Sequence, residues 1–143
     1  MPVILQISTW PEHKMNPLLQ ESDGEGFRFL QRLRDDWISG VNRFALTGEA
    51  LFGAFEEEHL VAVGGINRQS DGCGRLRRFY VLKDYRRRGI GRLLVRHLLK
   101  FASLHYSRVV LHTDSEAADH FYVAVGFVRQ AASADPTHFI ELN

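Results

Sequence analysis

The 143-residue sequence has almost none of the cysteine that builds disulfide-rich folds and cysteine-based metal sites. Cys73 is the only cysteine, so no disulfide can form within the chain, and no cysteine pair marks a zinc site. No apolar run approaches the roughly 20 residues that a transmembrane helix needs. The first residues, MPVILQISTW, lack the basic segment of a secretory signal peptide. We therefore expect a cytoplasmic protein with no metal and no membrane partner.

A large excess of one charge is also missing. Lysine and arginine number 18 and aspartate and glutamate 17, which gives a formal net charge of +1. Half of the basic residues nevertheless fall between Arg75 and Arg96. A nucleic-acid surface would be broader and would interleave aromatic side chains with the basic ones, whereas Phe79 and Tyr80 stand in an apolar run. We therefore expect no nucleic-acid partner.

The length and the composition fit one globular domain. A content of 45% hydrophobic and 24% charged residues is ordinary for a folded protein, and no low-complexity tract divides the chain. Domains most often have about 100 to 150 residues. We expect a single domain over residues 1–143.

The spacing of apolar residues predicts an α/β (α+β) fold, a mixed sheet flanked by helices. The expected order is β-α-β-β-β-α-β-α-β-β. A strand, a helix and a strand in succession should form a parallel pair with a right-handed crossover, here from strand 76–82 to strand 108–113. The segment between Pro11 and Pro17 is expected to be a loop. Strands are expected at 3–8, 50–57, 60–66, 76–82, 108–113, 126–130 and 137–142, and helices at 26–40, from about Gly89 onward, and at 115–125.

Strands 50–57, 60–66 and 76–82 are expected to form an antiparallel meander. The stretch RRRGIGR, Arg86 to Arg92, lies between the third of these strands and the body of the long helix. The first backbone N–H groups of a helix have no intrahelical partner, so such a junction can hold a phosphate. A P-loop would need Gly-Lys-Ser/Thr, and a Rossmann fingerprint would need glycine at Leu94. A merely solvated basic helix start is the alternative, although cations there oppose the helix dipole.

Two motifs together resemble the GNAT acyltransferase superfamily. VLKDYRRRGIGRLL resembles its motif A, an Arg/Gln-x-x-Gly-x-Gly/Ala turn, with Arg86, Gly89 and Gly91 at the defining positions. SEAADHFYVAVGF resembles its motif B. The matching motif B residues are Ala118, Phe121, Tyr122, Gly126 and Phe127.

The resemblance implies that acetyl-CoA is the acyl donor and that the central parallel strands are splayed to admit it. Phe79, Tyr80 and Val81 would line the acyl group and the pantetheine arm. Ser115 stands where relatives carry an asparagine near the arm, with a helix cap as its other role. Arg86 marks the motif, and the pyrophosphate would be held by Arg87, Arg88, Gly89, Ile90, Gly91 and Arg92.

The same resemblance implies N-acetyl transfer to an amine, with Tyr122 as the general acid for the leaving thiolate. Arg75 occupies a position where many relatives have a glutamate that serves as a base. The base therefore remains open among His112, Asp114, His120 and Glu56 to Glu58. The acceptor, a small-molecule amine or a protein amine, is also open, as is a homodimer. A non-catalytic CoA-binding or acyl-CoA-binding regulatory module is the alternative function.

Overall fold

The computed structural model describes residues 2–131 and 134–142. The chain forms β1 (Val3–Gln6), α1 (Glu12–Gly24), α2 (Phe29–Ser39), β2 (Ala50–Glu56), β3 (His59–Ser70), β4 (Cys73–Val81), the short 3-10 turn η1 (Lys83–Tyr85), α3 (Ile90–Ala102), β5 (Arg108–Leu111), α4 (Glu116–Ala124), β6 (Val128–Arg129) and β7 (His138–Glu141). The strands form one sheet in the order β1-β2-β3-β4-β5-β7-β6.

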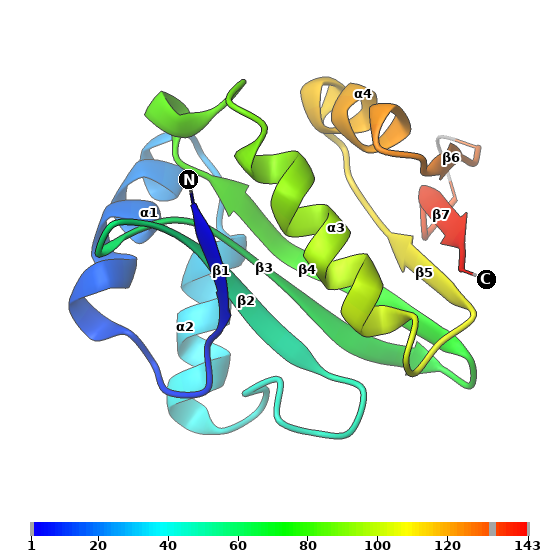
Figure 1. The fold of residues 1–143 in the computed structure, drawn as a ribbon, viewed down its shortest axis with the longest axis horizontal. Helices are drawn as coiled ribbons and strands as arrows, with labels where there is room; N and C mark the ends of the chain where they lie inside the picture. The colour runs from blue at the N-terminus through cyan, green and yellow to red at the C-terminus, as the bar shows by residue number, and fades with distance from the viewer. Residues whose placement is uncertain (1, 132–133, 143) are drawn as a thin grey trace.

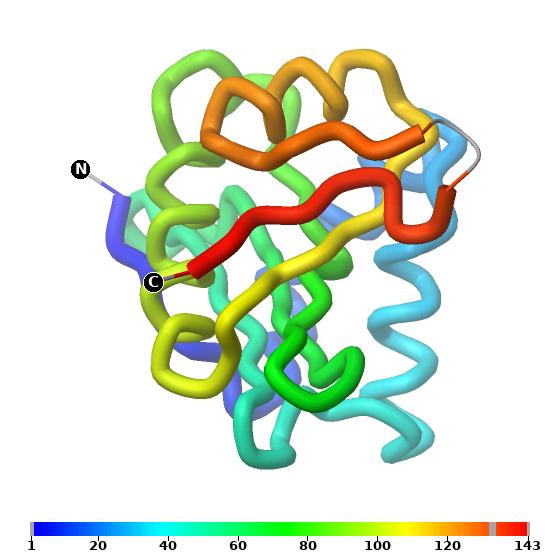
Figure 2. Tube along the Cα trace, turned by 90° about the vertical axis from the view of Figure 1, so that its right-hand side faces the viewer, coloured from blue at the N-terminus to red at the C-terminus, as the bar shows by residue number. Residues whose placement is uncertain are grey.

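The sheet lies between two layers of helices. α1 and α2 cover one face, and α3 and α4 cover the other (Figure 1). Figure 2 shows α2 and α3 on opposite sides of the sheet. Each layer encloses its own apolar cluster, one against α1 and α2 and one against α3 and α4. The predicted class, a mixed sheet flanked by helices, is confirmed.

Helix α1 corrects the prediction of a loop between Pro11 and Pro17. Pro11 is the N-cap residue, and Pro17 lies inside the helix, where it cannot donate a backbone hydrogen bond. Met15, Leu18 and Leu19 follow helical spacing and are buried. Their burial outweighs the missing hydrogen bond, so two helices precede β2 instead of the single helix expected.

Helix α2 agrees with the prediction. Leu30, Leu33 and Trp37 fall on one face at helical spacing and are buried against the sheet. Gly40 ends the helix with a φ of 83°, in the left-handed region that glycine enters without steric cost.

Strands β2, β3 and β4 form the predicted antiparallel meander, and β4 carries a bulge. Val63 of β3 faces Tyr80 and Gly65 faces Arg77, so β4 holds one more residue than β3 between these pairs. Arg78, within the bulge, has a φ of 58°. At this bulge the side chains of β4 change from an alternating pattern to the continuous apolar run Phe79 to Val81.

The parallel pair of β4 and β5 opens after three residue pairs. Pairing runs from Cys73 with Arg108 to Arg75 with Val110. Beyond Arg75, β4 continues to Val81 with no further pairing to β5 among the described residues. The predicted splay of the central parallel strands is confirmed, and it leaves one backbone edge of β4 free of a partner strand.

Candidate active site

The turn between β4 and α3 presents a row of unpartnered backbone N–H groups. Arg87 and Gly89 have φ values of 63° and 81°, and α3 begins directly afterwards at Ile90. Within the described residues, no acceptor takes the N–H groups of Arg87, Arg88 or Gly89. The N–H groups of Ile90 to Arg92 form the first helical turn, where no intrahelical acceptor exists. The turn therefore has the geometry of an anion site at a helix N-terminus.

The two glycines of the turn have different roles. Gly89 takes a left-handed conformation, and a Cβ atom there would meet no protein atom within 4 Å. Gly91 instead lies against α4 and β4, where a Cβ atom would stand 3.3 Å from ring carbons of Phe121 and 3.5 Å from Val81 Cγ2. Gly89 thus leaves open space beside the turn, whereas Gly91 allows α3 to pack closely.

Arg86 holds the turn onto the sheet. Its Nε atom donates to the carbonyl oxygen of Val81 over 2.9 Å, and its Nη2 atom pairs with Glu25 Oε1 at 2.8 Å. This bond to Arg86, followed by one from Tyr80, lowers the pKa of Glu25. The guanidinium of Arg86 is therefore engaged by the fold, while Arg87, Arg88 and Arg92 are exposed.

Glu21 of α1 and Glu25, the C-cap residue of that helix, also join α1 to β4 and the turn, and sequence reasoning missed both. Glu21 Oε2 accepts from the Tyr80 hydroxyl at 2.7 Å and from the backbone N–H of Lys83 at 2.8 Å, and Glu25 accepts from the same hydroxyl. Their i, i+4 spacing would have placed them on one helix face had α1 been predicted.

The side chains that follow the bulge alternate between the two faces of the sheet. Phe79 and Val81 point to the α3 and α4 face, where Phe79 stacks on Phe121 with ring centroids 5.6 Å apart. Tyr80 belongs to the cluster under α1 and α2. The residues predicted to line the acyl arm are therefore divided between the two faces of the sheet, with the Tyr80 side chain on the face of α1 and α2.

Tyr122 lies on the buried face of α4, beside Phe79, with ring centroids 5.9 Å apart. The residue is 6% exposed, and burial raises the pKa of its phenol above the ordinary value. Its hydroxyl forms no hydrogen bond within the described part of the chain, and it is not among the fully buried unpaired atoms there. The hydroxyl is therefore available to a partner that the protein does not supply.

His112, one of the predicted bases, lies at the end of β5 among charged side chains. His112 Nε2 lies 3.2 Å from Asp114 Oδ1, and His112 Nδ1 lies 3.3 Å from Asp135 Oδ1. Arg75 Nη2 also donates to Asp135 Oδ1, at 3.0 Å, and chiefly lowers the pKa of that carboxyl. Because Arg75 pairs with Val110, His112 lies two residues beyond the last β4–β5 pair and directly after the end of β5, where the splay begins.

A comparison with family models identifies the chain. Residues 9–127 match the model of the acetyltransferase (GNAT) family. The chain belongs to the GNAT family. Members of this family use acetyl-CoA or another acyl-CoA, which supports acyl transfer as the general chemistry.

Solved structures of GNAT proteins resemble the chain over almost its full length. A candidate acetyltransferase from Exiguobacterium sp. 255-15 is 32% identical with a TM-score of 0.88, covering 99% of this chain and 93% of the other. An acetyltransferase from Streptococcus agalactiae 2603, 19% identical with a TM-score of 0.77 over 99% of this chain and 98% of its own, shares the fold. The comparison with curated proteins gives no match.

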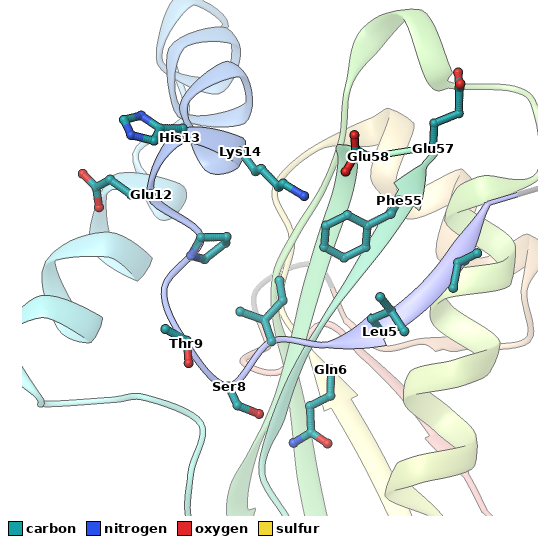
Figure 3. A pocket seen from close by; sticks show the side chains of 13 residues that line it. Leu5, Gln6, Ser8, Thr9, Glu12, His13, Lys14, Phe55, Glu57 and Glu58 are labelled. Carbon is teal, nitrogen blue, oxygen red and sulfur yellow. The ribbon is translucent and has the colours of Figure 1, made fainter.

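The remaining candidates lie at other places in this GNAT fold. Ser115 caps α4, since its side-chain oxygen accepts from the N–H of Ala118 at 3.2 Å. His120 is exposed on α4. Glu57 and Glu58 line a pocket of about 780 Å³ between β1, the start of α1 and the β2–β3 turn (Figure 3). β1 is an edge strand, three strands away from β4, so this pocket is separate from the β4–β5 splay.

Residues 2–131 and 134–142 of this GNAT protein contain neither a group of metal ligands nor a helix that could span a membrane. No three histidine, cysteine, aspartate or glutamate side chains in that part are grouped as metal ligands. None of the helices described there has the length and the apolar character needed to cross a bilayer.

Proposed function

We propose that residues 1–143 form one N-acetyltransferase domain that transfers an acetyl group from acetyl-CoA to a primary amine by direct attack. The observations that carry this proposal are two sets of backbone groups without a partner in the described residues, the N–H groups of the turn at Arg87–Arg92 and the open edge of β4. Tyr122, whose hydroxyl forms no hydrogen bond within the described residues, stands beside that edge.

Backbone groups would bind most of the donor. The N–H groups of Arg87 to Arg92 would bind the pyrophosphate, with the exposed arginines adding attraction. The free edge of β4 at Phe79, Tyr80 and Val81 would pair with the pantetheine arm as a sheet pairs with an added strand. Ser115, at the start of α4, would contact the same arm, since its cap bond leaves the hydroxyl proton available. Bound in this way, acetyl-CoA supplies an activated thioester.

The transfer needs a polarised carbonyl, a proton for the leaving sulfur and an unprotonated amine. The amine nitrogen forms a bond to the acyl carbon as the carbon–sulfur bond breaks. A backbone N–H near Val81 would polarise the carbonyl, and the Tyr122 hydroxyl would protonate the sulfur. For a lysine-like amine of pKa about 10.4, deprotonation at pH 7 costs about 4.6 kcal/mol. A base should therefore contribute.

His112 is the candidate base that the geometry favours, because it lies at the opening of the splay and is oriented by Asp114 and Asp135. We expect His112→Gln to lower kcat/KM about tenfold at pH 7, a modest effect for a general base. The loss should shrink as the pH rises, since more of the amine is then already unprotonated. The exposed His120→Gln is the control. A pH–rate profile of His112→Gln that matches the wild type would remove His112 from this role.

The proposed function is tested by two measurements on the intact chain. Acetyl-CoA at 100 times its dissociation constant should add about 2.7 kcal/mol to the free energy of unfolding, read as a rise in melting temperature. A panel of primary amines should then release free CoA thiol. No rise with acetyl-CoA or CoA would contradict both the enzyme and the binding module. A rise without thiol release from any amine would favour the non-catalytic module.

A further inference from the structure

Two adjacent arginines at the bulge of β4 face the helix layer opposite α4. Gly65, which pairs with Arg77, points toward Phe44 in the cluster under α1 and α2, so Arg77 shares that face. The Arg78 side chain is 10% exposed and lies 3.7 Å from Asp36 Oδ2 of α2. Its Nε atom is buried and has no hydrogen-bond partner within the described part of the chain.

Burial and a neighbouring positive charge both act against the guanidinium of Arg78. Desolvation lowers the pKa of Arg78 to about 10, and Arg77 lowers it in the same sense, while Asp36 opposes the shift. The same burial lowers the pKa of Arg77, which forms no ion pair with any described residue. A buried guanidinium without its hydrogen bonds costs stability, and an anionic ligand would supply them.

We propose that Arg77 and Arg78 bind an oxyanion of the acceptor, so that the substrate is a small primary amine carrying a carboxylate or a phosphate. The inference rests on the proposed function. Arginine suits this role because its planar fork presents parallel N–H donors to two oxygens of one anion.

The position of the pair indicates a small acceptor. Arg78 directly precedes Phe79 to Val81, the segment proposed to hold the thioester, and residues along a strand rise by about 3.3 Å each. His112 lies at the same level across the splay. The anion and the reacting amine would therefore be only a few bonds apart, as in an amino acid or a phosphorylated amino alcohol. A lysine side chain within a protein has no anion at that spacing.

A structural ion pair between β4 and α2 is the other explanation for Arg78. It would account for the contact with Asp36, but it leaves Arg78 Nε unpaired and gives no role to the neighbouring Arg77. The two explanations differ in one measurable respect, because only a binding role predicts discrimination between charged and neutral ligands of the same shape.

The test uses binding of product analogues, which requires no turnover. N-acetylalanine is compared with N-acetylalaninamide, and N-acetyl-O-phosphoethanolamine with N-acetylethanolamine, all in the presence of CoA. Affinities are read by NMR titration of the arginine Nε–H signals. We expect the anionic member of at least one pair to bind about tenfold or more tightly than its neutral partner, as charge-assisted hydrogen bonds give. The pair that responds distinguishes carboxylate from phosphate.

Three variants assign the effect to Arg78. Arg78→Met should bring the affinity for the anionic ligand to that of its neutral partner, while CoA affinity stays unchanged. Arg78→Lys keeps the charge but loses the planar fork of donors, so it should retain part of the preference for the anionic ligand. It replaces Arg78→Met in the test if the methionine variant fails to fold. Arg96→Met, an exposed position on α3, is the control.

Three results would overturn the inference. These are equal affinity for both members of each pair, no binding of any analogue, and a preference that survives Arg78→Met. Failure of the proposed function appears separately, because it is read from the acetyl-CoA melting shift and from thiol release.

Discussion

Tyr122→Phe is expected to lower kcat for acyl transfer about a hundredfold, the lower range for loss of a general acid. CoA affinity should stay within about twofold, because the phenyl ring that packs against Phe79 is retained. Burial raises the pKa of Tyr122, so its phenol stays protonated at neutral and mildly alkaline pH. The wild-type rate should therefore not fall through ionisation of this group up to about pH 10. Thiol release measured across pH checks both statements.

Tyr106 provides a matched control, because it is also 6% exposed but donates its hydroxyl to the Gly48 carbonyl at 2.7 Å. Tyr106→Phe should cost about 1 kcal/mol of unfolding free energy through the lost hydrogen bond and leave kcat unchanged. Tyr122→Phe should instead lower kcat and leave the free energy of unfolding nearly unchanged. The Tyr122 hydroxyl, unlike that of Tyr106, forms no hydrogen bond within the described residues that the substitution could remove. Wild-type turnover in Tyr122→Phe would show that Tyr122 belongs only to the core.

Most of the fold could be predicted from the sequence, because its elements follow strong local patterns. α3 buries Leu94, Leu98 and Ala102 at helical spacing, and the splay follows from the strand-helix-strand order together with the family motifs. α1 was missed because Pro17 is a helix breaker by local propensity, and only the packing of Met15 and Leu18 overrides it. Tertiary burial of this kind is not visible in a short window of residues.

Only the part of the candidate site that the backbone forms was predictable from the sequence. The turn at Arg87–Arg92 shows in the glycine spacing of RRRGIG, and its amides without partners in the described residues follow from the helix start. Contacts between distant segments were not predictable. Arg86 is held by Glu25, and Arg78 meets Asp36, across more than 40 positions of sequence in each case. The separate roles of the arginines therefore needed the three-dimensional arrangement.

Gly89→Val is expected to weaken CoA binding about a hundredfold. The φ of 81° at Gly89 places any other residue in the left-handed region, which costs about 1 to 2 kcal/mol and more for a β-branched side chain. Distortion of the turn would also remove charge-assisted hydrogen bonds from its amides to the pyrophosphate, worth about 1.5 to 3 kcal/mol each. Isothermal titration calorimetry with CoA measures the loss.

Gly40→Val separates backbone strain from ligand binding, because Gly40 has a φ of 83° at the end of α2, away from the turn. It should lose comparable stability and bind CoA as the wild type does. Arg88→Ala should weaken CoA binding only about two- to fivefold, since the exposed Arg88 side chain contributes a screened charge. A larger loss in Arg88→Ala than in Gly89→Val would mean that side-chain charge, and not access to the backbone amides, holds the pyrophosphate. Gly91 is less suited to this comparison, because a side chain there would press on Phe121 and disturb the packing of α3 against α4.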